Sequence, residues 1–211
     1  MSAPQGSAEW LLERCGRATA SRIADIMAKT KSGPGASRDS YAAQLIAERL
    51  TGYIAASFTN AAMAHGTETE PEARRAYEFV VDCDVEQVGF VPHPTIAMAG
   101  ASPDGLVGTD GLVEIKCPNT STHIDTLLSG SVPGKYIKQM HFQMMCCDRQ
   151  WCDFASYDPR LPERMRLFVK RVPRDEALVA EIEAEVTAFL AEVEAKVAQL
   201  TTAYEPQREA A

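Results

Sequence analysis

Two acids and a lysine in the middle of the chain have types and spacing that could do chemistry. Asp104 belongs to a Pro-Asp-Gly turn, and Glu114 and Lys116 belong to a short, mainly apolar segment at residues 112–118. Strand side chains alternate between faces, so Glu114 and Lys116 point to one side while Ile115 points to the other. A hairpin of this length can return Glu114 beside Asp104. Two carboxylates and one ammonium group are therefore expected to converge on one face of a sheet.

Such a cluster would repel itself unless a cation lay between the two acids. Carboxylate oxygens, together with the backbone carbonyl of Ile115, suit Mg²⁺ or Mn²⁺. One or two such ions would supply Lewis-acid chemistry for phosphodiester hydrolysis, and Lys116 would offset charge on the phosphate. The same residues also fit a surface hairpin in which Glu114 and Lys116 form an exposed ion pair worth at most about 1 kcal/mol. The spacing alone leaves both interpretations open.

The composition is that of a soluble globular protein. Of 211 residues, 45% are hydrophobic and 24% are charged, which is enough apolar material for a full core. No apolar run approaches the roughly 18 residues of a membrane span, and the first ten residues lack a secretory-signal pattern. We expect a cytoplasmic protein with no membrane partner. A single domain is expected over residues 1–211, with its core at about 10–172 and a terminal amphipathic helix at about 174–200.

The formal net charge of −8 does not exclude a DNA partner, because the acidity is unevenly distributed. Residues 174–211 hold nine acids and three bases, a balance of −6. The remaining 18 bases and 20 acids leave residues 1–173 nearly neutral. Residues 1–38 hold six bases against three acids, so a local basic groove could still bind phosphate.

The six cysteines favour reduced side chains in a cytosolic fold, because they form no C-x-x-C pair and lack matching histidine spacing. Cys146, Cys147 and Cys152 lie close together in the sequence. An iron–sulfur cluster at these three residues would need a fourth ligand from a distant part of the chain.

Hydrophobic periodicity predicts helices interleaved with short strands. Helices are expected at 8–30, 41–50, 60–80, 135–148 and 178–200. The first is interrupted near Gly16 and restarts at about Thr19, with Thr19 or Ser21 as its cap, and residues 29–35 are expected to form a loop. Strands are expected at 85–91, 96–101, 112–117, 151–157 and 165–172, the first three as an antiparallel meander. This order predicts an α+β fold with one central mixed sheet, flanking helices and a long C-terminal helix.

Four segments carry a resemblance to a known family. They are Arg-Ala-Thr-Ala-Ser-Arg-Ile at 17–23, His-Gly-Thr-Glu-Thr-Glu-Pro-Glu-Ala-Arg at 65–74, Ala-Ser-Pro-Asp-Gly at 101–105 and Glu-Ile-Lys-Cys-Pro at 114–118. In order and with few gaps from about Trp10 to Val172, the chain resembles the lambda-exonuclease and YqaJ-type viral recombinase family. This family belongs to the PD-(D/E)xK nuclease superfamily, so the resemblance implies a restriction-endonuclease-like core.

The resemblance also implies a catalytic centre, residue by residue. Its members are Asp104 and Glu114 as metal ligands, the Ile115 carbonyl as a backbone ligand, Lys116 as the catalytic lysine, Glu70 as a helix acid and Gln139 as a helix glutamine. Arg14, Ser21 and Ser102 match the family's pocket for a terminal 5′-phosphate. Guanidinium and hydroxyl groups suit that role because they make several charge-assisted hydrogen bonds to phosphate oxygens.

One position departs from the family pattern. Thr122 stands where the family carries a further phosphate-binding arginine, and Lys138 or Arg17 could substitute for it. Lys31 and Met63 match positions of a wedge that parts the strands ahead of the active centre. An unbranched apolar side chain such as Met63 could slide between base pairs, although a helix methionine often belongs to the core.

The resemblance implies a Mg²⁺-dependent 5′→3′ exonuclease that degrades one strand of linear double-stranded DNA, with Mn²⁺ as a substitute ion. Its 3′ overhangs would serve a single-strand annealing protein of the Red-beta or RecT kind in recombination. The family also implies a homotrimeric ring around DNA, in the cytoplasm of a bacterial host of a phage or prophage. Two alternatives remain: an endonuclease of the same superfamily, and a non-catalytic module that binds DNA ends.

Overall fold

The computed structural model describes residues 3–31, 33–54 and 61–204, with side chains from residue 64 onward in the last range. The elements in chain order are α1 (Ala8–Arg14), β1 (Ala18–Thr19), a 3-10 helix (Ala20–Arg22), α2 (Ile23–Ile26), β2 (Lys29–Thr30), β3 (Gly33–Pro34), α3 (Ala36–Thr51), α4 (Ala61–Val81), β4 (Val85–Glu86), β5 (Val91–Pro92), β6 (Ala99–Ala101), β7 (Gly105–Val107), β8 (Gly111–Lys116), α5 (Thr120–Ser129), α6 (Gly134–Cys147), β9 (Trp151–Tyr157), a second 3-10 helix (Glu163–Met165), β10 (Leu167–Pro173) and α7 (Glu176–Ala203). Helices and strands are interleaved along the chain, which confirms the predicted α+β class.

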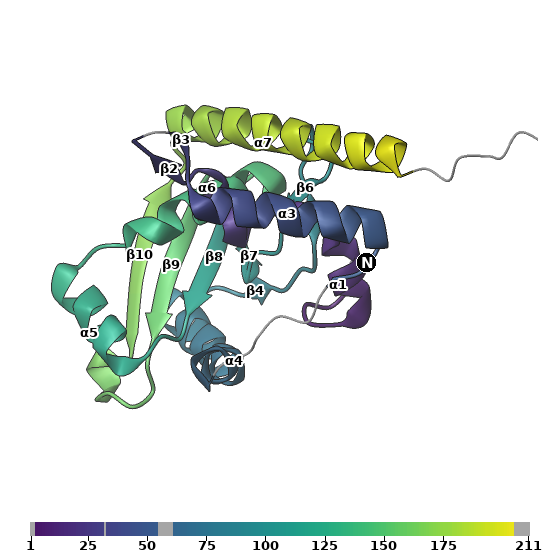
Figure 1. Cartoon of the computed structure of the whole chain (residues 1–211). Coiled ribbons are helices and arrows are strands. Elements are labelled where there is room, and N and C mark those ends of the chain that lie inside the picture. The colour runs from purple at the N-terminus through teal and green to yellow at the C-terminus, as the bar shows by residue number, and fades with distance from the viewer. Residues whose placement is uncertain (1–2, 32, 55–60, 205–211) are drawn as a thin grey trace, which may run out of the picture.

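A five-stranded mixed sheet, in the order β10-β9-β8-β7-β4, lies at the centre of the molecule (Figure 1). Strands β8 and β9 run parallel, and the other neighbouring pairs of this sheet are antiparallel. Helix α4 packs on one face of the sheet and α6 packs on the other. The predicted arrangement of a mixed sheet with flanking helices is therefore confirmed.

Strand β8 divides its side chains between these two helices. Val113 and Ile115 lie in a buried cluster with Tyr77 of α4. Leu112 lies in a separate buried cluster with Met140 of α6. The even-numbered side chains of β8 therefore face α6, as the alternation of a strand requires.

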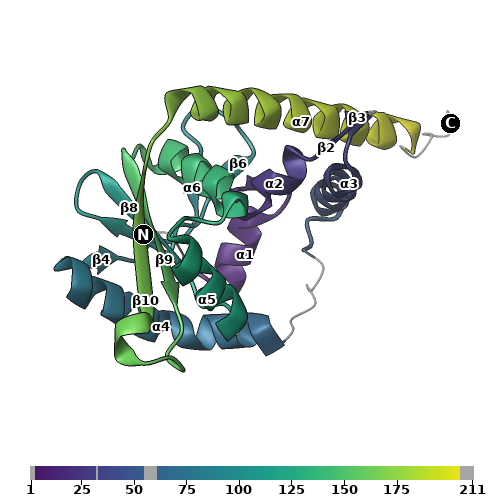
Figure 2. The ribbon, with the colours of Figure 1, turned by 90° about the vertical axis from the view of Figure 1, so that its left-hand side faces the viewer.

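A second layer of helices, α2, α3 and α7, covers the side of α6 that faces away from the sheet (Figure 2). Helix α7 begins at a cap: Asp175 accepts hydrogen bonds from the N–H groups of Ala177 at 2.9 Å and Leu178 at 3.3 Å. Its apolar stripe is buried, and Phe189 stacks on Tyr41 of α3 with ring centroids 5.6 Å apart. Neither α7 nor any other helix in the described ranges is long and apolar enough to cross a membrane.

The helix predicted to restart at about Thr19 is correct only in part, because its start and its extent to residue 30 are wrong. Residues 18–19 form β1, and helical structure is confined to a 3-10 helix and the short helix α2 at residues 20–26. Ala18 pairs with Ala99 in a parallel ladder, and the Thr19 N–H donates to the Tyr41 hydroxyl at 3.1 Å. The Thr19 side chain makes no capping bond, and Ser21 lies inside the 3-10 helix. Pairing with residues some eighty positions away has overridden the local helical pattern.

The single sheet and the three-strand meander need correction too. The segment at 85–91 splits into β4 and β5, which belong to different sheets. Strands β1, β6 and β5 form a three-stranded sheet of their own, and the expected loop at 29–35 contains the hairpin β2–β3. Helix α5 was not predicted at all. It begins at a local signal, since the Asn119 side chain accepts from the Thr122 N–H at 3.0 Å, and it ends at Gly130.

Substituting Gly111 tests the packing between β8 and β9. A Cβ atom at Gly111 would lie 2.1 Å from the ring of Trp151, and the Arg171 guanidinium lies over that ring at 3.4 Å from its centroid. We expect Gly111→Ala to lower the free energy of unfolding by about 1–3 kcal/mol because the ring has little room to move. Gly134→Ala, with open space around the site, is the control and should change it by less than about 0.5 kcal/mol. Equal unfolding midpoints in urea for the two variants would contradict this account.

Candidate active site

Asp104 and Glu114 lie opposite each other where the β7–β8 hairpin opens. Gly105 pairs with Val113, so continuing the register by one residue places Asp104 opposite Glu114. The Ile115 N–H donates to Oδ2 of Asp104 at 2.7 Å, which fixes this carboxylate against β8. The structure thus brings the two acids together, as strand alternation and hairpin length predicted.

The Glu114 carboxylate is fully buried, and three side chains contact its oxygens. From α6, Gln139 donates to Oε1 at 2.6 Å and Gln143 donates to Oε2 at 2.6 Å. The Lys116 ammonium group forms an ion pair with Oε1. A carboxylate removed from water needs such partners, because an unpaired buried charge is very costly. The interpretation as an exposed surface pair is therefore wrong.

Burial and the neighbouring Glu114 carboxylate raise the pKa of Asp104 to about 8. Burial alone would lower the pKa of Lys116, but Glu114 and Asp104 hold it above its ordinary value. The lysine therefore stays charged, while Asp104 holds a proton over much of the neutral range. A cation placed beside Asp104 would favour its ionised form and displace that proton.

The donor atoms fit a hard divalent cation. Within the described ranges, no three or more His, Cys, Asp and Glu side chains are grouped as a metal site. Asp104 and Glu114 supply two carboxylates, so an ion held there would complete its shell with the Ile115 carbonyl and water, as Mg²⁺ commonly does. Burial and the Glu114 carboxylate raise the pKa of Asp104 even with the Lys116 ammonium group nearby, so one lysine does not fully offset the two acids in the free protein. The residues therefore fit Mg²⁺ or Mn²⁺.

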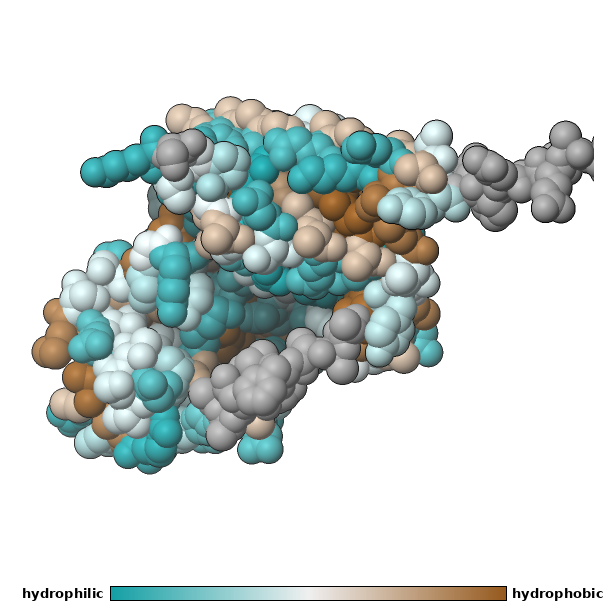
Figure 3. All heavy atoms as spheres, viewed as in Figure 1, coloured by the Kyte–Doolittle hydropathy of each residue, from teal (hydrophilic) through white to brown (hydrophobic). Residues whose placement is uncertain are grey.

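Lys116 lies between two cavities. The first, of about 220 Å³, is lined by Asp104, Glu114 and Gln139, and also by Arg14 and other residues of the N-terminal segment. The second, of about 350 Å³, is lined by the Glu70 side of α4, by the end of β8 and by the start of α6. The molecular surface shows a hollow with hydrophilic walls between α4 and the helical layer (Figure 3). The active-site residues are thus reached from an open, polar face.

Residues expected to bind a phosphate gather at the far side of the 220 Å³ cavity. Arg14 donates to the Ser102 hydroxyl at 3.1 Å, and Ser21 lines the same cavity. The Trp10 indole N–H also donates to Ser102, at 2.9 Å, and the Arg14 guanidinium lies 4.3 Å from the Trp10 ring centroid. Burial lowers the pKa of Arg14 from its usual value, although the group remains charged. The structure therefore brings all three expected residues to one cavity.

Glu70 lies on α4 and lines the second cavity with Ile115 and Lys116. The Arg74 guanidinium, one turn later, pairs with Glu70 at 2.6 Å and orients it. The Glu70 charge contributes to the raised pKa of Asp104. The predicted helix acid is thus near the centre, across Lys116 from the phosphate-binding residues.

The remaining expected residues lie outside this centre. Lys31 is exposed in the turn between β2 and β3 and lines neither cavity. Met63 belongs to α4, but its side chain is outside the described residues. Thr122 lies in the first turn of α5, and Lys138 is on α6; neither lines the cavity that holds Arg14. Arg17 lines an adjacent hollow of about 440 Å³ that shares Arg14.

Sequence reasoning missed Gln143 and Trp10. Gln143 follows Gln139 by four residues, so the two share a helix face, and this spacing could have identified it. Trp10 has no such local signal, because its partner Ser102 is 92 residues away. Gln5 was also missed; it ties the N-terminal segment to the site by donating to the Pro103 carbonyl at 2.8 Å.

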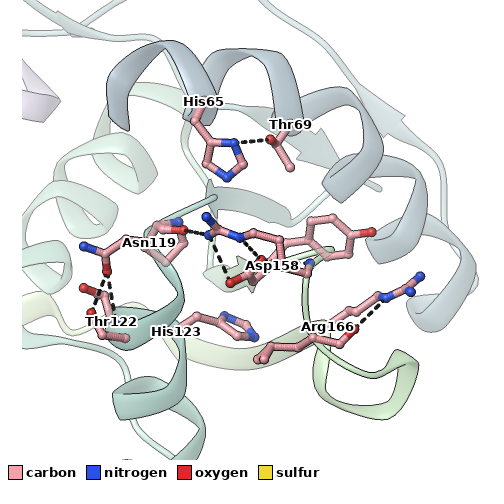
Figure 4. A network of polar contacts seen from close by, with 12 residues as sticks. His65, Thr69, Asn119, Thr122, His123, Asp158 and Arg166 are labelled. Carbon is pink, nitrogen blue, oxygen red and sulfur yellow. Dashed lines mark hydrogen bonds and ion pairs between the residues drawn. The ribbon is translucent and has the colours of Figure 1, made fainter. Parts of the chain in front are cut away.

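A buried polar network beyond the end of β8 holds the segment that leads into α5 (Figure 4). Arg160 donates to Oδ1 of buried Asp158 at 2.6 Å and to the Pro118 carbonyl at 3.1 Å. Burial alone would raise the pKa of Asp158, but the Arg160 bonds lower it to about 2. The network therefore anchors the end of β8, the strand that carries Glu114 and Lys116, to the end of β9.

In the metal-free protein, Asp104→Asn should raise the free energy of unfolding by about 1 kcal/mol or more near pH 8.5. The pKa of Asp104 is about 8 when folded and close to 3.8 when unfolded, so the wild type loses stability as pH rises through that window. Asparagine removes the charge and still accepts from the Ile115 N–H. Urea unfolding in a chelator should show the gain shrinking as pH falls and vanishing below about pH 3, where the aspartate is protonated in both states. A gain independent of pH would contradict the assigned protonation of Asp104.

Comparisons with known proteins agree with this geometry. LHK-Exo, an alkaline exonuclease from Laribacter hongkongensis, is 55% identical, with a TM-score of 0.87 over 93% of this chain and 97% of its own. Its complex with dAMP gives the same values. A phage-related exonuclease from Haemophilus somnus 129PT, 15% identical, supports the fold alone, with a TM-score of 0.69 over 87% of this chain and 96% of its own. No curated protein sequence matches the chain.

These likenesses confirm the expected PD-(D/E)xK-like core around the five-stranded sheet. A family description also matches the sequence itself, over residues 9–150, and that span includes α1, α4, β8 and α6 with the site residues they carry. The chain therefore belongs to the family of YqaJ-like viral recombinase domains.

Proposed function

We propose that this chain is a Mg²⁺-dependent exonuclease that degrades one strand of linear double-stranded DNA in the 5′→3′ direction and leaves 3′ overhangs. The coarser assignment, a DNA-degrading nuclease, follows from the family and from 55% identity with an alkaline exonuclease. The ion, the polarity and the overhang are the finer parts of the proposal, and the geometry of the site supports them.

The observation that carries the proposal is the cavity shared by Arg14 and the two acids. Arg14 is partly buried, and among the described residues its side-chain hydrogen bond goes to a neutral hydroxyl, that of Ser102. An arginine without a carboxylate partner is well suited to a phosphate. If a terminal phosphate binds at Arg14, the next phosphodiester along the strand lies at Asp104 and Glu114. Such spacing favours removal of one nucleotide from an end over cleavage within a strand.

The polarity follows from the kind of phosphate that an end carries. A 5′-phosphorylated end presents a phosphate monoester, which offers several oxygens to Arg14, Ser21 and Ser102. LHK-Exo has been solved with dAMP, a nucleoside monophosphate of the kind that stepwise digestion would release. Its similarity to this chain supports the same product here.

In this reaction Asp104, Glu114 and the Ile115 carbonyl would hold Mg²⁺, which supplies Lewis-acid stabilisation of charge on the phosphate when bound. Lys116, kept charged by the two acids, stabilises the negative charge that builds up as water attacks. Gln139 holds the Glu114 carboxylate in one orientation. Glu70 faces Lys116 from the second cavity and can orient water there.

The proposed setting is recombination in the cytoplasm of a bacterial host of a phage or prophage. The protein would act on DNA ends as a homotrimeric ring and pass its 3′ overhangs to a single-strand annealing protein. The family assignment supports this setting. The charge distribution is compatible with it, because the acidic helix α7 lies in the outer layer, away from the central sheet.

Two alternatives remain distinct from this proposal. An endonuclease of the same superfamily would use the same acids but would not need a terminal-phosphate pocket. A non-catalytic module that binds DNA ends would not need Lys116 beside a buried pair of acids. The residues present favour the exonuclease over both.

Digestion of linear and closed-circular duplex DNA should separate these functions. With Mg²⁺ the wild type should degrade the linear form and leave the circle intact, and a chelator should abolish the reaction. Lys116→Ala should lower kcat at least about 100-fold, because the charge that stabilises the phosphate is lost. Cleavage of the circle would instead identify an endonuclease, and a Lys116→Ala variant with the wild-type rate would rule out the mechanism.

Recognition of the end can be measured by comparing 5′-phosphorylated and 5′-hydroxyl DNA. The wild type should digest the phosphorylated form roughly tenfold faster or more, because several charge-assisted bonds are lost without the phosphate. Arg14→Gln should bring this ratio close to one. Arg164→Gln, at an exposed arginine of the second 3-10 helix that lines neither hollow, is the matched control and should keep the ratio. Equal wild-type rates on both ends would reject the assignment of Arg14, Ser21 and Ser102.

A further inference from the structure

Gln143 lies in the candidate active site but has no role in the proposed reaction so far. Its Nε2 donates to Oε2 of Glu114 at 2.6 Å, on the carboxylate oxygen that Gln139 leaves free. The side chain is 1% exposed and lines the 220 Å³ cavity together with Arg14. Gln143 is thus buried beside the acids, on the side where the terminal nucleotide would lie.

The amide oxygen of Gln143, Oε1, is buried and has no hydrogen-bond partner among the described residues. Rotating the Gln143 amide by 180° would be unfavourable. It would place Oε1 next to the Glu114 carboxylate, and the 2.6 Å hydrogen bond from Nε2 would be lost. A buried acceptor without a donor is unfavourable. A ligand that brings a donor to this oxygen would therefore gain a favourable bond.

The chemistry of a terminal nucleotide identifies that donor. Its 5′-phosphate offers acceptors, which suit Arg14 but not Oε1 of Gln143. Its 3′ oxygen carries the phosphate that lies at Asp104 and Glu114. Hydrolysis breaks the bond between phosphorus and this 3′ oxygen, adds the water oxygen to phosphorus and leaves a proton on the 3′ oxygen. The product therefore presents a new hydroxyl donor in the stretch of the cavity that Gln143 lines.

We propose that Gln143 binds the 3′-hydroxyl group of the released nucleoside monophosphate, with Nε2 still on Glu114 and Oε1 accepting the hydroxyl hydrogen. This inference rests on the proposed function, from which it takes the mononucleotide product. Oε1 is shielded in the free protein, so a neighbouring side chain must rotate to admit the nucleotide. Gln143 already lines the 220 Å³ cavity, so this movement would open Oε1 to a space that the nucleotide can enter.

Calorimetric titration with dAMP and with its 2′,3′-dideoxy analogue tests the proposal on the full chain in the presence of Mg²⁺. The wild type should bind dAMP roughly three- to tenfold more tightly, the value of one hydrogen bond to the 3′-hydroxyl. Gln143→Met, which keeps the length of the side chain but removes both polar atoms, should bring the ratio to about one. Gln150→Met is the matched control: the same substitution at an exposed glutamine outside this cavity should leave the preference for dAMP unchanged.

The outcomes separate the inference from the function on which it rests. Equal wild-type affinities for the two nucleotides, in a protein that degrades linear DNA, would show that Gln143 does not bind the hydroxyl while the exonuclease stands. A Gln143→Met variant that keeps the preference would lead to the same conclusion. A wild type that neither binds dAMP nor degrades linear DNA would overturn the proposed function, and the inference with it. The wild-type comparison decides even if a variant fails to fold.

Discussion

The burial of the Glu114 carboxylate beside Asp104 is the constraint on which the rest of this structure depends. Two acids in the interior of a sheet are tolerated only if other groups supply hydrogen bonds and positive charge. Helix α6 must therefore present two glutamines to β8, and Lys116 must fold back onto its neighbour. These contacts also position the site, because the two glutamines hold α6 against β8 and the ion pair holds the Lys116 side chain beside Glu114.

Several polar groups that line the same cavity lack a full set of charged or hydrogen-bonding partners in the free protein. Asp104 has its pKa raised to about 8, and the partly buried Arg14 contacts a neutral hydroxyl. The amide oxygen of Gln143 has no partner among the described residues. Each arrangement costs stability by itself, and under the proposed function each would be complementary to part of a DNA end bound with a metal ion. Several polar groups with unfavourable free energies in one cavity are typical of a functional site.

The N-terminal segment completes the site across a large distance in sequence. Trp10 and Arg14 both donate to Ser102, which lies two residues before Asp104. Gln5 donates to the backbone on either side of β5 and β6, at Val88 and Pro103. The residues proposed to bind phosphate are therefore fixed to the same backbone segment that carries the first acid. This common attachment holds Arg14 and Asp104 around one cavity.

The sequence by itself determined the features that depend on neighbouring residues. Strand alternation placed Glu114 and Lys116 on one face, and helical periodicity located α4, α6 and α7 close to their observed bounds. The resemblance to a family then identified Arg14, Ser21 and Ser102, which the structure gathers in one cavity. Local patterns suffice for these features because an alternating or helical period is written into consecutive residues.

Only the tertiary structure decided which of those residues are removed from water and what they touch. It showed Glu114 as a buried carboxylate, where the spacing alone also allowed an exposed ion pair. It put a strand paired to β6 at residues 18–19, where the helix was expected to start, and it brought Trp10 to Ser102. The partners that bury Glu114 lie 25 and 29 residues away on α6, and the pairing of β1 and the Trp10 contact join segments some eighty to ninety residues apart. No local pattern records those contacts, and the chemistry of this site depends on them.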